Sequence, residues 1–307
     1  MRLIYGIPTD KEAVQIRLGV SKGFFEEEGI NLELKVIFGG PEIARAYDDG
    51  SIVIGEIGSP PAIVALQKKY RFKIVASSIR QRALQYFVTN PGINSWDQLR
   101  GKTMATLSIG SCSYWFMRQV LLSRGLNPDR DVKIIGLGKD YPKVVNMFLS
   151  KKITGAILSE PNVSIGEAAG AFVIKEKLAS AEFSPLMQWS IIVANNKFSS
   201  SSPDVVLAIL RGIFRSYQYC INNPEEFVEY SADYLGVCRH AISNAVEREK
   251  SGLCSNGILS KAALQEAINL QYRLGAIKYK PKIDELVDFS YLETLYRPND
   301  AKGKLTL

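Results

Sequence analysis

The sequence predicts an α/β protein made of two doubly wound lobes that are joined by a two-segment hinge. Short apolar segments rich in β-branched residues alternate with segments of helical periodicity from the N-terminus onward, and the alternation begins again near residue 92. A length of 307 residues also suits two units, because single domains usually run to about 100–200 residues.

The first predicted lobe contains four strands separated by helices. This order calls for a parallel sheet with helices on both faces. The expected strands are residues 2–6, 32–37, 52–57 and 73–76, and the expected helices are residues 13–22, 44–49 and 59–66.

The third strand and its turn are the most clearly marked part of this lobe. The sequence Gly58-Ser59-Pro60-Pro61 ends the strand and opens a helix, since serine is a preferred N-cap and proline is tolerated in the first turn. A helix N-terminus can hold an anion, or Ser59 can simply cap its own helix. Ligands of parallel sheets bind beyond the carboxyl ends of the strands. That rule places these residues on one rim: Thr9, Asp10, Gly39, Gly40, Ser59, Ser78 and Arg80.

A second series of strands and helices follows. Its expected strands are residues 102–106, 132–137 and 154–161, with helices at residues 114–124 and 141–150, and a further expected strand at residues 86–90 precedes the series. Residues 190–195 are expected to return to the first lobe as a strand. We therefore assign residues 1–89 and 191–307 to the first lobe, with a helical C-terminal part, and residues 90–190 to the second.

The loop before the helix at residues 114–124 is a candidate anion site. It offers hydroxyl groups, helix-start amides and a glycine that allows close approach of the backbone. The expected contacts are Ser108, Ser111, Cys112 and Ser113. The alternative is an ordinary capped helix.

Three further side chains have two interpretations each. Arg80 can bind a carboxylate or sulfonate in bidentate fashion, or remain solvated. Glu160 would repel an anion unless it pairs with Arg80 or with a cationic group of the ligand. Trp189 can close over a ligand or belong to the core.

Composition excludes several classes of protein. The net charge of +7 is spread along the chain without a basic block, so we expect no nucleic-acid partner. No apolar run reaches the ~18 residues that span a bilayer. The four cysteines lack metal-ligand spacing, and we expect neither a metal nor a cofactor. Because residues 1–6 enter a predicted strand directly, we expect a cytoplasmic protein if Met1 is the native start, or a periplasmic or cell-surface protein if a leader was removed.

Several segments, taken in order, resemble the type II periplasmic binding protein superfamily, in the branch that binds nitrate, sulfonates, taurine and thiamin precursors. They are residues 21–30, 58–63, 95–102, the segment around Ser111, and residues 156–161. The resemblance implies two lobes that close over a small solute and hand it to an ABC importer. The resemblance matches four segments to the loops that line the family's cleft: residues 8–10, residues 39–40, Ser59 and Ser78. It matches Ser111 and Ser113 to the site that often holds an anionic head group. Glu160 corresponds to a position that often faces the cleft.

We therefore expect a solute-binding protein, without catalysis, for a small anionic or zwitterionic organic molecule, with an ABC permease as its partner. The alternative is a cytoplasmic enzyme on the same fold that acts on a small aromatic, sulfur-containing or thiamin-related substrate through Cys112 or Glu160. The superfamily includes a sulfinate desulfinase with a cysteine nucleophile, and thiols at helix N-termini ionise more readily.

Overall fold

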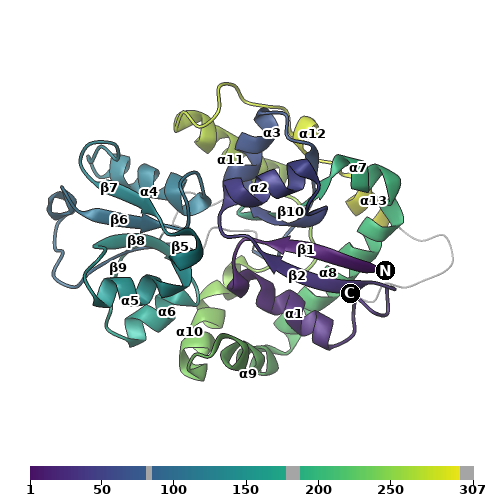
Figure 1. The fold of residues 1–307 in the computed structure, drawn as a ribbon, viewed down its shortest axis with the longest axis horizontal. Helices are drawn as coiled ribbons and strands as arrows, with labels where there is room; N and C mark the ends of the chain where they lie inside the picture. The colour runs from purple at the N-terminus through teal and green to yellow at the C-terminus, as the bar shows by residue number, and fades with distance from the viewer. Residues whose placement is uncertain (81–84, 178–186, 298–307) are drawn as a thin grey trace.

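The computed structural model describes residues 1–80, 85–177 and 187–297, which form two α/β lobes side by side (Figure 1). Each lobe is built on a five-stranded sheet with helices packed against it. This arrangement confirms the predicted fold class of two α/β lobes.

The first sheet has the strand order β2-β1-β3-β10-β4. β1 is parallel to β2 and β3, whereas β10 is antiparallel to β3 and β4. The strands are β1 (Arg2–Ile7), β2 (Asn31–Val36), β3 (Ile54–Gly58), β4 (Phe72–Ser77) and β10 (Ser190–Asn195).

The second sheet has the order β7-β6-β8-β5-β9, and β5 is antiparallel to both of its neighbours. Its strands are β5 (Gln85–Thr89), β6 (Thr103–Thr106), β7 (Lys133–Gly136), β8 (Gly155–Ser159) and β9 (Val173–Lys177). The sequence analysis placed residues up to 89 in the first lobe. That boundary needs correction because β5 hydrogen-bonds to β8 and β9, so the chain crosses between the lobes before Gln85.

Helices surround both sheets, and 3-10 turns lead into several of them. The second lobe holds α4 (Cys112–Ser123), α5 (Val144–Leu149), α6 (Asn162–Ala168), η2 (Trp96–Leu99) and η3 (Gly138–Lys143). The first lobe holds η1 (Asp10–Ala13), α1 (Val14–Ser21), α2 (Gly40–Asp49), α3 (Ser59–Gln67), α7 (Asn196–Ser201), α8 (Pro203–Asn222), α9 (Pro224–Leu235), α10 (Arg239–Glu249), η4 (Lys250–Gly252), α11 (Lys261–Arg273), α12 (Ile283–Leu286) and α13 (Ser290–Tyr296). α10 packs against α6 and so reaches from the first lobe to the second (Figure 1).

The strand β3 lies in the middle of the first sheet because small and β-branched residues suit a crowded, fully buried position. A Cβ atom at Gly55 would lie 2.2 Å from the carbonyl oxygen of Gly6 on β1, so only glycine fits at this contact. β3 thereby delivers Gly58 and the start of α3 to the gap between the lobes.

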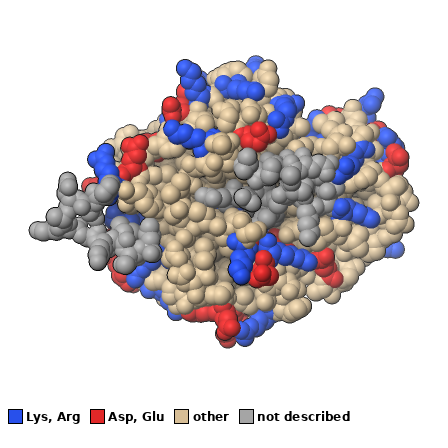
Figure 2. Space-filling model, turned by 180° about the vertical axis from the view of Figure 1, so that it is seen from behind, with Lys and Arg blue, Asp and Glu red and all other residues tan. Residues whose placement is uncertain are grey.

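Among the described residues, no helix combines the length and the apolar character that a membrane span requires. Figure 2 shows lysine and arginine interspersed with aspartate and glutamate on the back of the molecule. The net positive charge is thus distributed on this face rather than gathered into one basic patch.

Candidate functional site

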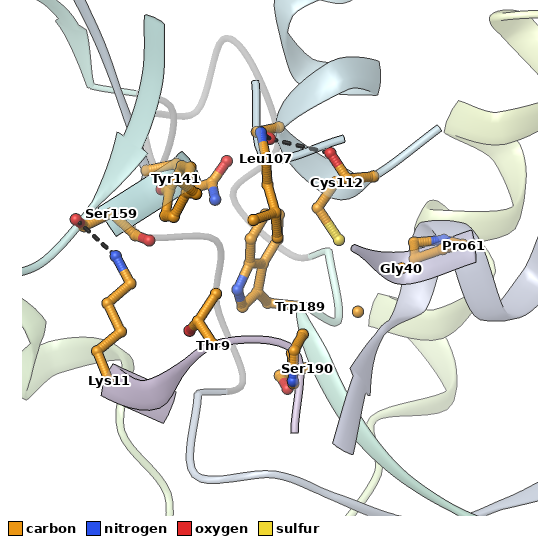
Figure 3. A pocket seen from close by; sticks show the side chains of 15 residues that line it. Thr9, Lys11, Gly40, Pro61, Leu107, Cys112, Tyr141, Ser159, Trp189 and Ser190 are labelled. Atoms are coloured by element: carbon orange, nitrogen blue, oxygen red, sulfur yellow. Dashed lines mark hydrogen bonds between the residues drawn. The ribbon is translucent and has the colours of Figure 1, made fainter. Parts of the chain in front are cut away.

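A small pocket lies between the two lobes (Figure 3). Its volume is about 40 Å³, whereas about 10–15 Å³ suffices for one water molecule, so it has room for a small solute. The described residues that line it are Pro8, Thr9, Lys11, Gly40, Gly58, Pro61, Gln85, Leu107, Ser111, Cys112, Ser113, Tyr141, Ser159, Trp189 and Ser190.

The N-termini of three helices meet at this pocket. Gly40 is the first residue of α2, Gly58 is the N-cap of α3, and Ser111 is the N-cap of α4. Helix N-termini carry unpaired N–H groups and a partial positive charge. Lys11 is the one charged residue among the described lining residues, and none of them is a carboxylate. The pocket is therefore electropositive and suits an anion.

The hydroxyl groups at the start of α4 are held by local hydrogen bonds. Ser111 Oγ accepts from the backbone N–H groups of Tyr114 (3.4 Å) and Ser108 (3.3 Å), and Ser113 Oγ accepts from that of Leu107 (3.0 Å). The two hydroxyl oxygens lie 3.0 Å apart. This contact uses one of the two hydroxyl hydrogens, and the other can donate to a ligand.

Two first-lobe residues face the second lobe across the pocket. Lys11 Nζ donates to the carbonyl oxygen of Ser159 (3.0 Å), which joins η1 to the end of β8 (Figure 3). Thr9 is 5% exposed, and its hydroxyl oxygen has no hydrogen-bond partner among the described residues. A buried hydroxyl without a partner costs free energy, so a bound molecule that satisfies it gains affinity.

Gln85 is a second buried polar group without a partner. It is the first residue of β5, pairs in register with Ser159, and is 6% exposed. Its Oε1 atom has no hydrogen-bond partner among the described residues. Gln85 and Lys11 were missed in the sequence analysis. The available signal for Gln85 was a polar residue directly before an apolar strand.

The structure brings six of the predicted site residues to the pocket. They come from four separate segments of the chain: Thr9, Gly40, Ser111, Cys112, Ser113 and Trp189. The Cys112 sulfur lies close to Gly58, since a Cβ atom added at Gly58 would be 2.0 Å from it. Trp189 lines the pocket and also packs on Phe116, with ring centroids 5.3 Å apart.

Five other predicted site residues, four from the rim and one from the loop before α4, lie outside the lining. Gly39 is the N-cap of α2, and Asp10 lies 3.6 Å from Arg17 in an ion pair. Ser59 is buried within α3 and donates to the carbonyl of Gln188, while Ser78 lies 3.4 Å from the Tyr217 hydroxyl. Ser108 Oγ donates to Glu42 Oε2 across the lobes (3.3 Å). Their polar groups are thus engaged within the protein.

Arg80 and Glu160 are two further charged candidates that lie outside the lining and need correction. Arg80 makes a bidentate ion pair with Glu249 (2.9 and 2.8 Å). Glu160 accepts from Arg248 (3.0 Å) and from the N–H of Ser164 (2.9 Å). Neither lines the pocket, because the C-terminal helix α10 supplies each with a partner of opposite charge.

Buried tyrosines surround the carboxylate of Glu56 on β3. Tyr217 donates to Glu56 Oε1, and Tyr47 donates to its backbone carbonyl (2.9 Å). Burial, together with the nearby Glu56, raises the pKa values of Tyr5, Tyr47 and Tyr217 well above their ordinary range. All three therefore stay protonated at neutral pH, and Tyr47 and Tyr217 act as structural donors.

Replacing Arg80 with alanine should lower the free energy of unfolding by about 3–5 kcal/mol, because it leaves the Glu249 carboxylate buried without its cation. Both side chains are only 8% exposed. Urea denaturation measures the loss, and the double variant Arg80→Ala/Glu249→Ala should lose less than the two single variants together. A loss under about 1 kcal/mol in Arg80→Ala would contradict this structural role.

Comparisons with known proteins agree with this architecture. Residues 12–227 match the family described as NMT1/THI5 like. The chain is 27% identical over 232 residues to a binding protein of Brucella abortus, covering 75% of this chain and 70% of that protein. It is 23% identical over 230 residues to the taurine-binding periplasmic protein of Escherichia coli, covering 75% and 69%.

The fold is also similar to that of a solved binding protein. The alkanesulfonate-binding protein SsuA from Xanthomonas axonopodis pv. citri, bound to MOPS, superposes with a TM-score of 0.77 at 14% identity, covering 94% of this chain and 98% of the other. The resemblance to type II periplasmic binding proteins is thus confirmed at the level of fold. The chain belongs to the NMT1/THI5-like family and has the two-lobed fold of periplasmic binding proteins.

Proposed function

We propose that this protein is a solute-binding protein that holds a small organic anion of the sulfonate class between its lobes and delivers it to the permease of an ABC importer. In this role it acts in the periplasm or at the cell surface. The sulfonate class is taken from two relatives of this chain, the taurine-binding and alkanesulfonate-binding proteins.

The observation that carries the proposal is the electrostatic character of the pocket. Three helix N-termini and Lys11 supply positive charge, and the described lining residues include no carboxylate. A sulfonate has three acceptor oxygens, which suits the backbone N–H groups and hydroxyls at the start of α4.

Closure of the lobes supplies the mechanism. Lys11 bonds to Ser159, and Ser108 bonds to Glu42, so two polar contacts already join the lobes. A solute held by residues of both lobes has more contacts in the closed form than in an open one. Its differential affinity therefore shifts the population toward the closed form that a permease recognises.

The enzyme alternative retains only Cys112 as a catalytic candidate, because Glu160 is paired with Arg248 outside the pocket. A cysteine nucleophile is activated by a nearby base or by a lowered pKa, as at a helix N-terminus, and a base is also needed to move protons during catalysis. The described lining residues include no histidine or carboxylate, and His240 is exposed beside Asn244 (3.2 Å). These contacts favour binding over catalysis.

At least one of four two-carbon sulfonates should raise the melting temperature of the protein: ethanesulfonate, 2-hydroxyethanesulfonate, sulfoacetate and taurine. A ligand present at 100 times its dissociation constant adds about 2.7 kcal/mol to the free energy of unfolding. Differential scanning fluorimetry measures the shift, with sodium chloride at equal ionic strength as the control. No shift with any of the four would refute a sulfonate ligand.

The bound sulfonate should protect Cys112 from alkylation by N-ethylmaleimide, because its sulfur lines the pocket. The exposed Cys238 provides an internal reference that should react equally with and without ligand. Burial raises the pKa of Cys220 to about 12, so this thiol should stay protonated and unlabelled at pH 8. Peptide mass spectrometry reads out each site, and equal labelling of Cys112 with and without ligand would count against binding there.

Replacing Gly58 with alanine should weaken sulfonate binding by about tenfold or more, since overpacking in the closed form costs about 1–3 kcal/mol. The added Cβ would lie 2.0 Å from Cys112 Sγ, on the opposite lobe. The double variant Gly58→Ala/Cys112→Ala should recover most of the affinity, because the remaining contact to the Cys112 Cβ is 3.7 Å. Isothermal titration calorimetry tests both variants. Wild-type affinity in Gly58→Ala would show that closure does not bring these residues together.

A further inference from the structure

The pocket has a second polar end away from the start of α4, which we call the Ser159 end. In Figure 3, Ser159 and Cys112 lie on opposite sides of Trp189. The Ser159 end consists of Thr9, Lys11, Gln85, Tyr141 and Ser159. These residues come from both lobes, so a group bound here contacts both.

Gln85 brings a hydrogen-bond acceptor to this end. It is the first residue of β5 and pairs in register with Ser159 on β8, so the two side chains share one face of the second sheet. Gln85 is 6% exposed, and its Oε1 atom has no hydrogen-bond partner among the described residues. A carbonyl oxygen only accepts hydrogen bonds, so the group that completes it has to carry an O–H or an N–H.

Thr9 reaches the same end from the first lobe. It follows β1, it is 5% exposed, and its Oγ1 atom has no hydrogen-bond partner in the part of the chain that the structure describes. A hydroxyl can donate or accept, so it can pair with a hydroxyl or with an ammonium group of a solute. Buried polar groups in proteins are almost always paired. Thr9 and Gln85 therefore indicate that a polar group of a bound molecule completes this end.

We propose that the solute carries a hydrogen-bond donor, either a hydroxyl or an amino group, at the end opposite its sulfonate. This group donates to Gln85 Oε1 and shares a second hydrogen bond with Thr9 Oγ1. The inference rests on the proposed function, since it assumes that a sulfonate occupies the start of α4. It makes Gln85 and Thr9 determinants of specificity, and it adds contacts to both lobes that favour the closed form.

Matched pairs of sulfonates test the proposal by isothermal titration calorimetry. 2-Hydroxyethanesulfonate and propane-1-sulfonate differ only in a hydroxyl against a methyl group, and taurine carries an ammonium in the same place. 2-Methoxyethanesulfonate and butane-1-sulfonate differ only in an ether oxygen against a methylene group. The second pair therefore adds an acceptor without adding a donor.

The wild-type protein should bind 2-hydroxyethanesulfonate or taurine about tenfold or more tightly than propane-1-sulfonate, because the methyl group leaves Gln85 Oε1 unpaired. The tighter of the two ligands identifies the donor as an O–H or an N–H. 2-Methoxyethanesulfonate should bind within about threefold of butane-1-sulfonate, since an ether offers no hydrogen to Oε1.

Variants of Gln85 assign this preference to its carboxamide. Gln85→Met removes the acceptor at similar length and should reduce the preference for the donor ligand over propane-1-sulfonate to about threefold or less. Gln85→Glu keeps an acceptor oxygen, so it should retain a preference of about tenfold or more even though its charge weakens every sulfonate. The ratio of two affinities cancels effects on the shared sulfonate or on the fold.

Two further variants complete the set. Thr9→Val keeps the shape of the side chain and should lower the preference by a smaller factor than Gln85→Met, because the bond to Gln85 remains. Gln265→Met makes the same substitution on α11, outside the lining of the pocket, and should leave all affinities unchanged.

The outcomes separate the inference from the proposed function. Equal binding of 2-hydroxyethanesulfonate, taurine and propane-1-sulfonate would overturn the inference, because the solute would then leave Gln85 to water. An equal gain from the ether and from the hydroxyl would also overturn it, because a donor of the protein would then recognise an acceptor of the solute. In both cases the sulfonates bind and the proposed function stands. Binding of no sulfonate to the wild-type protein would overturn the proposed function, and the inference with it.

Discussion

The structure depends on bringing the positive ends of three helices from two lobes to one small gap. α2 and α3 follow strands of the first sheet, and α4 follows a strand of the second, so each sheet aims its helix starts at the other lobe. Like-signed helix ends repel each other weakly, and an anion between them removes that repulsion. Glycine makes the approach possible, since a Cβ atom at Gly40 would lie 2.4 Å from the ring of Pro61. The same convergence therefore accounts for the position of the pocket, and it supports the proposed anionic ligand and the proposed closure of the lobes.

Carboxylates near the pocket are paired with arginine side chains of the protein, so their negative charge is balanced outside the pocket. Glu160 and Glu167 both pair with Arg248, while Glu42 contacts Arg45 and the Ser108 hydroxyl. Arg248 comes from α10, so the C-terminal helices take part in the electrostatics of the second lobe as well as in its packing. The partly exposed Arg248 pairs contribute modestly to stability, but they determine which charges a solute meets.

The rule that ligands of parallel sheets bind beyond the carboxyl ends of the strands predicts several of the residues that line the pocket. Thr9, Gly40 and Ser111 follow strands in the sequence, and all three line the pocket, because strand ends and helix starts are local features that neighbouring residues specify. Ser59 and Ser78 obey the same rule but face the interior, where Gln188 and Tyr217 accept or share their hydroxyl hydrogens. The direction of a side chain at a strand end depends on the helices and strands that pack around it. These elements come from distant parts of the chain, so the neighbouring residues do not predict them.

The sequence by itself determined the α/β class, the two lobes, most strands and the helix start at Ser111, since apolar periodicity, glycines and capping residues act within a few neighbours along the chain. The tertiary structure alone decided the partners of the charged groups. Glu249 lies 169 residues from Arg80, and the bond from Lys11 to Ser159 spans 148 residues. It also decided that β5 belongs to the second sheet. Ion pairs and strand partners at such separations depend on how the whole chain packs, because any buried charge pairs with whichever opposite charge the fold brings near.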